Sequence, residues 1–267
     1  MMSRRLLFLP LALCLVLAAF LLWYGLTTPL SPQSALASAY TTTTGLHSAH
    51  IVMEQIMHTS QEDRPVTRVW YAEGDFQFPD RMQMTARYDG QTMEMVTIGR
   101  KVYTRSAGQS TWQVQDLPLF VPVSFADVPT PDLKSMLEQM KMAGNVEQLP
   151  DEEIDGVLCL RYRWQVDFGR ARQQFRQQLN TQDPEVKAWS EALDRMEVES
   201  PPGIDYWIGK QDYRVRQFRM HYVVSMPTTL GPSGGVISRS PFSTTVTARL
   251  SEFDKPVYIK PPVESSP

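Results

Sequence analysis

Apolar and polar side chains alternate along residues 81–98, and this is the most regular pattern in the chain. Asp89-Gly90 interrupts the alternation at its midpoint, and this dipeptide is typical of the two-residue type I′ turn of a β-hairpin. The pairs predicted across the two strands are Tyr88 with Gln91, Ala86 with Met93, Met84 with Met95, and Met82 with Thr97. One face of the hairpin is therefore rich in methionine.

This methionine-rich face has two interpretations. Methionine is flexible and polarizable, so it suits a surface that adapts to irregular apolar partners, and the face would then be a wall that contacts lipid or an acyl chain. Alternatively, the face is an ordinary part of a core under a helix. The opposite face is expected to be polar, because it carries Arg81, Gln83, Arg87, Thr92 and Glu94.

Similar patterns predict the other elements of the fold. Strands are expected at residues 48–59, 66–76, 101–105, 111–114, 156–167, 204–208, 215–225 and 244–252. Helical spacing of apolar residues predicts helices at residues 34–45, 131–143 and 168–180, and in a segment that begins at Asp183. Residues 227–241 are expected to form a long hairpin loop or a mobile lip. The fold class is α+β, in which helices cover one face of a large antiparallel sheet.

Residues 6–26 contain no charged side chain and are long enough to span a bilayer. Arg4 and Arg5 favour a cytoplasmic N-terminus (residues 1–5) and place the rest of the chain outside the cytoplasm. We therefore expect a transmembrane anchor in the cell membrane, followed by a tether over residues 27–37. The alternative is a cleaved signal segment and a secreted protein, because Ala35-Leu36-Ala37 fits an A-x-A cleavage pattern.

The part beyond the tether is expected to be one domain over residues 38–262, with a disordered tail at residues 263–267. The two cysteines are Cys14 and Cys159, so no disulfide can form inside this domain and its stability must come from its core. Without Arg4 and Arg5, the 29 acidic residues outnumber the basic ones. Nucleic acid is therefore excluded as a partner, since binding it requires a basic surface.

No catalytic or metal motif stands out in the sequence. It has no G-x-S-x-G, H-E-x-x-H, P-loop or dinucleotide fingerprint, and the histidines at 47, 50, 58 and 221 lack metal-ligand spacing. The acidic residues 151–155 lack the alternating ligands of a calcium loop, so a solvated turn is expected there. Arg161 and Arg163 could lower the pKa of Cys159 on their shared strand face. Without a histidine in register, an inert thiol is expected. We expect no enzyme, no metal and no cofactor.

Two passages carry a resemblance to a known family. Residues 93–104 read MEMVTIGRKVYT, with Trp112 soon after, and residues 205–215 read DYWIGKQDYRV. The first resembles the strand–turn–strand passage of the LolA-like lipoprotein-carrier group, and the second its late hairpin. This group also includes the RseB-type anti-sigma regulators and the LppX and LprG lipid-binding lipoproteins. The chain departs from it in one respect, because a transmembrane helix would hold it in place of an acylated cysteine.

The resemblance implies an unclosed antiparallel half-barrel, covered on its concave side by helices, with an apolar cavity for acyl chains. The residues that would line the cavity are Trp70, Met82, Met84, Met93, Met95, Tyr162, Trp164, Phe218 and Met220. The expected function is that of a membrane-tethered carrier, presenter or extractor of a lipid or a lipidated protein. The alternative is a sensor or interaction module, similar to the RseB-type regulators, that binds an envelope protein.

Overall fold

The computed structural model describes residues 30–61, 64–116, 145–167, 197–230 and 236–262, together with the single residues Leu137, Met140, Gly169 and Gln173. Within these ranges the chain forms one helix and eleven strands. The elements are α2 (Pro32–Thr44), β1 (Ser48–Gln61), β2 (Arg64–Gln77), β3 (Arg81–Tyr88), β4 (Gln91–Ile98), β5 (Lys101–Ser106), β6 (Gln113–Asp116), β7 (Val146–Ile154), β8 (Val157–Gln165), β9 (Glu197–Gly209), β10 (Val215–Leu230) and β11 (Val236–Ser251).

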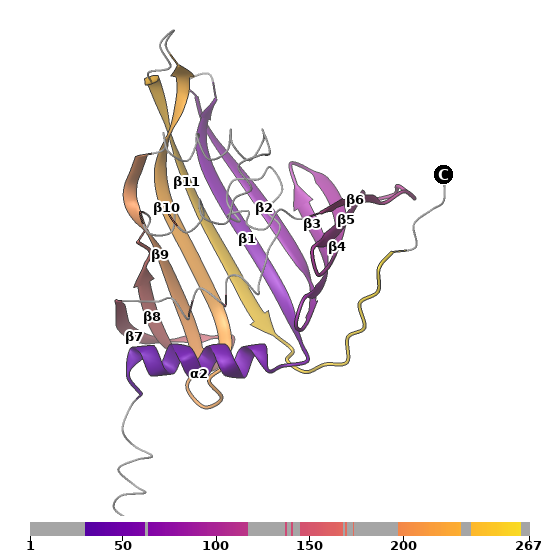
Figure 1. Ribbon diagram of the computed structural model, residues 1–267, viewed down its shortest axis with the longest axis vertical. Coiled ribbons are helices and arrows are strands. Elements are labelled where there is room, and N and C mark those ends of the chain that lie inside the picture. Colours follow the sequence, from indigo (N-terminus) through magenta and orange to yellow (C-terminus); the bar gives the residue numbers. More distant parts are fainter. Residues whose placement is uncertain are drawn as a thin grey trace, which may run out of the picture.

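All eleven strands belong to one antiparallel sheet, in the order β6-β5-β4-β3-β2-β1-β11-β10-β9-β8-β7. Strands that are consecutive in sequence pair with each other, except β6 and β7, and β1 also pairs with β11 at the middle of the sheet. Figure 1 shows these long central strands side by side, with α2 lying across one end of the sheet. The edge strands β6 and β7 do not pair with each other, so the sheet is open, as a half-barrel requires.

The hairpin predicted at residues 81–98 is confirmed. Strands β3 and β4 have the expected bounds, and all four predicted cross-strand pairs are present. Asp89 and Gly90 both have positive φ angles, 46° and 75°, as a type I′ turn requires.

Two expectations about strands and loops were wrong. The acidic residues 151–153 lie in β7 and not in a turn, and the turn is formed by Asp155-Gly156, where both residues have positive φ. Strand β7 is an edge strand with mostly exposed side chains, so it lacks an apolar phase, and its charges protect the edge from further pairing. Residues 227–230 and 236–241 continue β10 and β11, because their β-branched residues favour strands and register shifts near Pro227 accommodate its missing N–H.

Helix α2 begins two residues before the predicted start. Ser31 caps it by accepting a hydrogen bond from the Ser34 backbone N–H at 3.2 Å, and Pro32 occupies its first turn. Ala35 and Leu36 are fully buried in the core. Cleavage after Ala37 would remove these core residues.

The other predicted helices lie outside the described residues, apart from the single residues Leu137, Met140, Gly169 and Gln173, of which Leu137 and Met140 are buried in the main core. Residues 6–26 also lie outside, so the membrane anchor stays a prediction. In the ranges given above, no helix combines the length and apolar character needed to cross a membrane.

The sheet has one large apolar face, called here the core face, and an outer face with two smaller clusters. The main cluster occupies the core face of almost every strand and includes residues of α2. On the outer face, Val96 and Tyr103 pack against Ile259, and Cys159 packs with Ile154 and Trp207. Ile259 belongs to the C-terminal segment, residues 255–262. Arg81 donates to the Ile259 carbonyl at 3.0 Å and holds this segment against the sheet.

Candidate functional site

The predicted wall residues fall in adjacent rows across the core face. The first row runs Tyr88, Trp70, Gln55, Val246, Met220, Ile204 and Trp164. The second row runs Met93, Ala86, Ala72, Met53, Ala248, Phe218, Tyr206 and Tyr162. The third runs Met95, Met84, Gly74, Ile51 and Leu250, and Met82 follows beside Phe76. All nine predicted residues therefore share one face.

Burial divides these nine residues into two groups. Seven are buried members of the main cluster: Trp70, Met82, Met84, Met95, Tyr162, Trp164 and Phe218. Met93 and Met220 are half-buried, and Met220 packs against the same cluster. The wall is thus one continuous apolar surface. That it lines a ligand cavity stays a prediction, since Leu137 and Met140 also pack into this cluster.

Small residues occupy the centre of the wall. Ala72, Ala86 and Ala248 lie in the second row and Gly74 in the third, between large methionine and aromatic side chains. Small side chains keep the apolar layer thin, so another apolar layer can approach the sheet closely there. The three alanines are buried, which shows that this part of the wall is covered and not open to solvent.

Gln55 is a polar residue of the wall that the sequence analysis missed. It is 1% exposed and lies between Trp70 and Val246 in the first row. Its signal was present in the sequence, because it stands in the apolar phase of the alternation that includes Ile51, Met53 and Met57.

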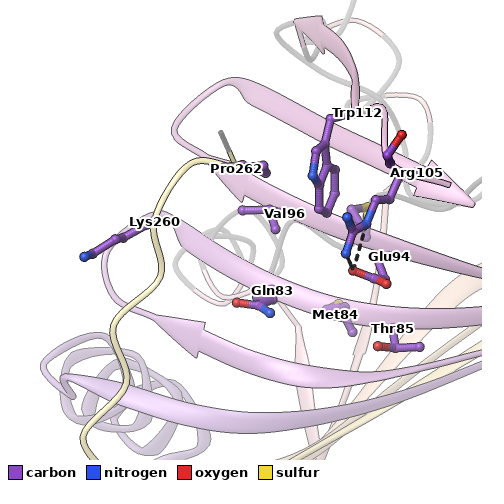
Figure 2. Close-up of a pocket in the computed structure, with 11 residues that line it drawn as sticks. Gln83, Met84, Thr85, Glu94, Val96, Arg105, Trp112, Lys260 and Pro262 are labelled. Atoms are coloured by element: carbon purple, nitrogen blue, oxygen red, sulfur yellow. Dashed lines mark hydrogen bonds and ion pairs between the residues drawn. The ribbon is translucent and has the colours of Figure 1, made fainter. Parts of the chain in front are cut away.

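A pocket of about 410 Å³ lies on the outer side of the hairpin. Figure 2 shows Glu94, Arg105 and Trp112 on one side of it, with Lys260 and Pro262 of the C-terminal segment on the other. Glu94 and Arg105 form an ion pair at 2.7 Å, and the Arg105 guanidinium stacks 4.5 Å from the centre of the Trp112 ring. The outer side of the hairpin therefore carries the predicted polar residues Gln83 and Glu94 together with the apolar Val96, and the C-terminal segment adds one wall to the pocket.

A charge network on the outer face of β7, β8 and β9 is built around Asp205. Arg163 donates two hydrogen bonds to its carboxylate, at 2.7 and 2.9 Å, and Arg161 donates one at 2.7 Å. Burial alone would raise the pKa of Asp205, but the hydrogen bonds from Arg163 and Arg161 outweigh it and lower the pKa. Arg161 also pairs with Glu152 at 3.2 Å. Because these carboxylates neutralise the arginines, we interpret the network as structural: its ion pairs link β7, β8 and β9.

Cys159 lies on the same outer face, where it packs with Ile154 and Trp207, and it is fully buried. Burial raises the pKa of its thiol, and the lowering effect of Arg216 is smaller. Arg161 and Arg163, which the sequence placed beside the thiol, are engaged with Asp205. The expectation of an inert thiol agrees with this geometry.

In a Cys14→Ser chain, Cys159 is expected to react with a disulfide reagent at pH 8 at least about a hundredfold more slowly than it does in denaturant, because its thiol is both buried and protonated. The measurement is the rate of absorbance change with and without guanidinium chloride. Rapid reaction of the folded chain would contradict the buried position.

Three of the histidines make ordinary structural hydrogen bonds. In each case the ring Nδ1 makes the bond. It lies 3.0 Å from Asp75 Oδ1 in His50, 2.9 Å from Thr67 Oγ1 in His58, and 2.9 Å from Thr245 Oγ1 in His221. Across the described portion of the chain, no group of three metal-binding side chains comes together.

Comparison with known proteins gives matches of structure only. No protein-family model matches the sequence, and no curated protein matches it. The chain is similar to the lipoprotein LppX of Mycobacterium tuberculosis, with 11% identity, a TM-score of 0.49, and coverage of 86% of this chain and 98% of that one. It is also similar to LprF of Mycobacterium bovis, with 14% identity, a TM-score of 0.47, and coverage of 86% and 96%.

A LolA superfamily protein from Nitrosomonas europaea also matches, with 10% identity, a TM-score of 0.25, and coverage of 86% of this chain and 96% of that one. The LolA-like group, to which the sequence showed a resemblance, is thus named among the solved structures that this chain is similar to. At these identities and TM-scores the similarities carry no conclusion about this chain, so its function is inferred from the geometry of the wall.

Proposed function

We propose that the chain is a non-catalytic, extracytoplasmic binding protein that holds an acyl chain of a lipid or lipoprotein against its core face. Under this proposal the open sheet is a half-barrel, helices cover its concave side, and residues 6–26 anchor it in the membrane. The observation that carries the proposal is the continuous apolar wall, in which flexible methionines from the hairpin lie beside aromatic residues of β2, β8 and β10. Such a wall binds apolar matter by excluding water, and no reacting group is needed.

The proposal is tested by native mass spectrometry of the full chain released from detergent micelles, followed by organic extraction of the bound material. We expect discrete adducts of lipid mass. A bare protein that also fails to take up added lipid would contradict the proposal.

Substitution of the half-buried wall residues is expected to weaken this binding. Met93→Glu or Met220→Glu would place a carboxylate beside the acyl chain. An unpaired charge in an apolar site is costly, so the lipid affinity calculated from the bound fraction should be at least about tenfold lower. The matched control is Val69→Glu, on the outer face of β2 and 47% exposed, which should leave the adducts unchanged. Equal loss in all three variants would indicate a general effect and not a site.

The second candidate function is a sensor or interaction module, similar to the RseB-type regulators. The outer pocket favours it, because the pocket combines an aromatic ring, an ion pair and the exposed cation of Lys260 in one recess (Figure 2). A photocrosslinking amino acid at Ser110, which lines the pocket, tests it against the same amino acid at Val69. A discrete protein adduct formed at Ser110 alone would favour this function, and equal labelling at both positions would oppose it.

A further inference from the structure

Two buried polar side chains face each other across a ladder in the otherwise apolar wall. Gln55 of β1 and Trp70 of β2 are directly paired, and each is 1% exposed. Directly opposed residues of an antiparallel pair have Cβ atoms about 4.5–5.5 Å apart, so the two polar groups start from adjacent points on the wall.

Each of these side chains retains one unused hydrogen-bonding atom. Gln55 Nε2 donates to Thr244 Oγ1 at 3.2 Å, which leaves Gln55 Oε1 as an acceptor without a donor. Trp70 Nε1 is a buried donor for which the described structure provides no acceptor. Buried polar atoms are nearly always paired in folded proteins, because an unpaired one loses its hydrogen bonds to water and gains none in return. Two such atoms on neighbouring residues of the wall therefore call for a common partner.

The chemistry of the missing partner follows from the two atoms. It must accept a hydrogen bond from Trp70 Nε1 and donate one to Gln55 Oε1. The residues that flank the pair in its row, Tyr88 and Val246, are uncharged, so a neutral group suits the position better than an ionised one. A hydroxyl or a secondary amide meets these requirements.

We propose that Gln55 and Trp70 form a polar subsite within the apolar wall, and that it takes the neutral hydroxyl or amide group of an acyl lipid. This inference rests on the proposed function, which it makes more specific. The apolar rows hold the chains, and the subsite selects lipids whose polar group lies close to those chains and carries a hydrogen-bond donor.

The test compares two probes that differ by one donor. These are 1,2-dioleoylglycerol and its 3-acetyl derivative, in which the hydroxyl is esterified. In native mass spectrometry titrations of the full chain, we expect dioleoylglycerol to bind about tenfold more tightly, because the acetyl derivative leaves Gln55 Oε1 unpaired. In Gln55→Met, which keeps the length of the side chain, the preference should fall below about twofold.

Gln217→Met is the matched control. Gln217 is also a buried glutamine, but it lies on β10 and its Oε1 accepts a hydrogen bond from Arg249 Nε at 2.9 Å. This variant should keep the tenfold preference. If Gln55→Met does not fold, Trp70→Phe removes the other half of the subsite and should weaken the binding of both probes, because each of them offers an oxygen that accepts from Trp70 Nε1.

The outcomes distinguish a failure of the subsite from a failure of the proposed function. Equal binding of both probes to the unchanged protein, or an unchanged preference in Gln55→Met, would overturn the subsite while leaving the proposed function intact. Binding of neither probe, together with the absence of lipid adducts, would overturn both.

Discussion

Replacing Gly74 by alanine is expected to lower the free energy of unfolding by about 3 kcal/mol or more. Gly74 lies inside β2, paired with Ile51 on one side and Met84 on the other. A Cβ atom at this position would lie 2.0 Å from the carbonyl oxygen of Gln83 and 2.7 Å from the Cα of Met84. Both are backbone atoms of β3, so the strands themselves would have to move apart. A close approach of this kind is a recognised reason for glycine inside a strand.

Gly203→Ala is the matched control, since Gly203 also lies in a strand but nothing is within 4 Å of the position of its Cβ. Its unfolding free energy should change by less than about 1 kcal/mol. Urea denaturation followed by tryptophan fluorescence measures both variants. Similar values for the two would show that the approach of β3 to Gly74 does not constrain the sheet.

Replacing Asp205 by asparagine is expected to cost about 3 kcal/mol of unfolding free energy at pH 7. The Asp205 side chain is only 6% exposed, and it is the shared acceptor for Arg161 and Arg163. The neutral amide would remove the anion that both arginines share and leave Arg161 with Glu152 alone, and removing one partner of a buried ion pair is more damaging than replacing the whole pair. Glu94→Gln, which breaks the more exposed Glu94–Arg105 pair, should cost no more than about 1 kcal/mol.

The same substitution is expected to change the pH dependence of stability. The folded state lowers the pKa of Asp205, so this carboxylate stabilises the fold above the ordinary carboxyl pKa of about 4, and the stabilisation is lost as the pH falls through the lower folded pKa. The difference between the original protein and Asp205→Asn should therefore be largest at neutral pH and shrink in acid. Urea denaturation at several pH values measures this difference. A difference that stays constant down to acid would show that Asp205 does not act through its charge.

The sequence predicted the structure best where a turn dipeptide and a regular alternation of apolar side chains indicated the same hairpin. In the hairpin, Asp89-Gly90 set the turn and the methionines set the phase, so even the pairing register was predicted correctly. Strand β7 is followed by the same kind of turn dipeptide, Asp155-Gly156. Because it is an exposed edge strand, however, its sequence shows no alternation of apolar and polar side chains. Its acidic run therefore looked like a solvated turn.

The candidate site was predictable for its apolar part only. The alternation of apolar and polar side chains along a strand identifies wall residues, and all nine predicted residues share the core face. The outer pocket was not predictable, because the C-terminal segment reaches Val96 and Trp112 through contacts between residues far apart in sequence. Gln55 stands in the apolar phase of β1 but was not among the predicted residues, and its burial beside Trp70 shows that it belongs to the wall.

The position of β1 and β11 in the middle of the sheet has a consequence for how the chain acquires its structure. The two consecutive series of strands, β1–β6 and β7–β11, meet along the β1–β11 ladder, and His47 hydrogen-bonds to Asp254, 207 residues further along the chain. Such long-range pairing is slow to form, and it requires the last strand to be present. While the chain is being synthesised, β1 therefore lacks one of its two neighbours, and the core face is completed only after β11 has been made.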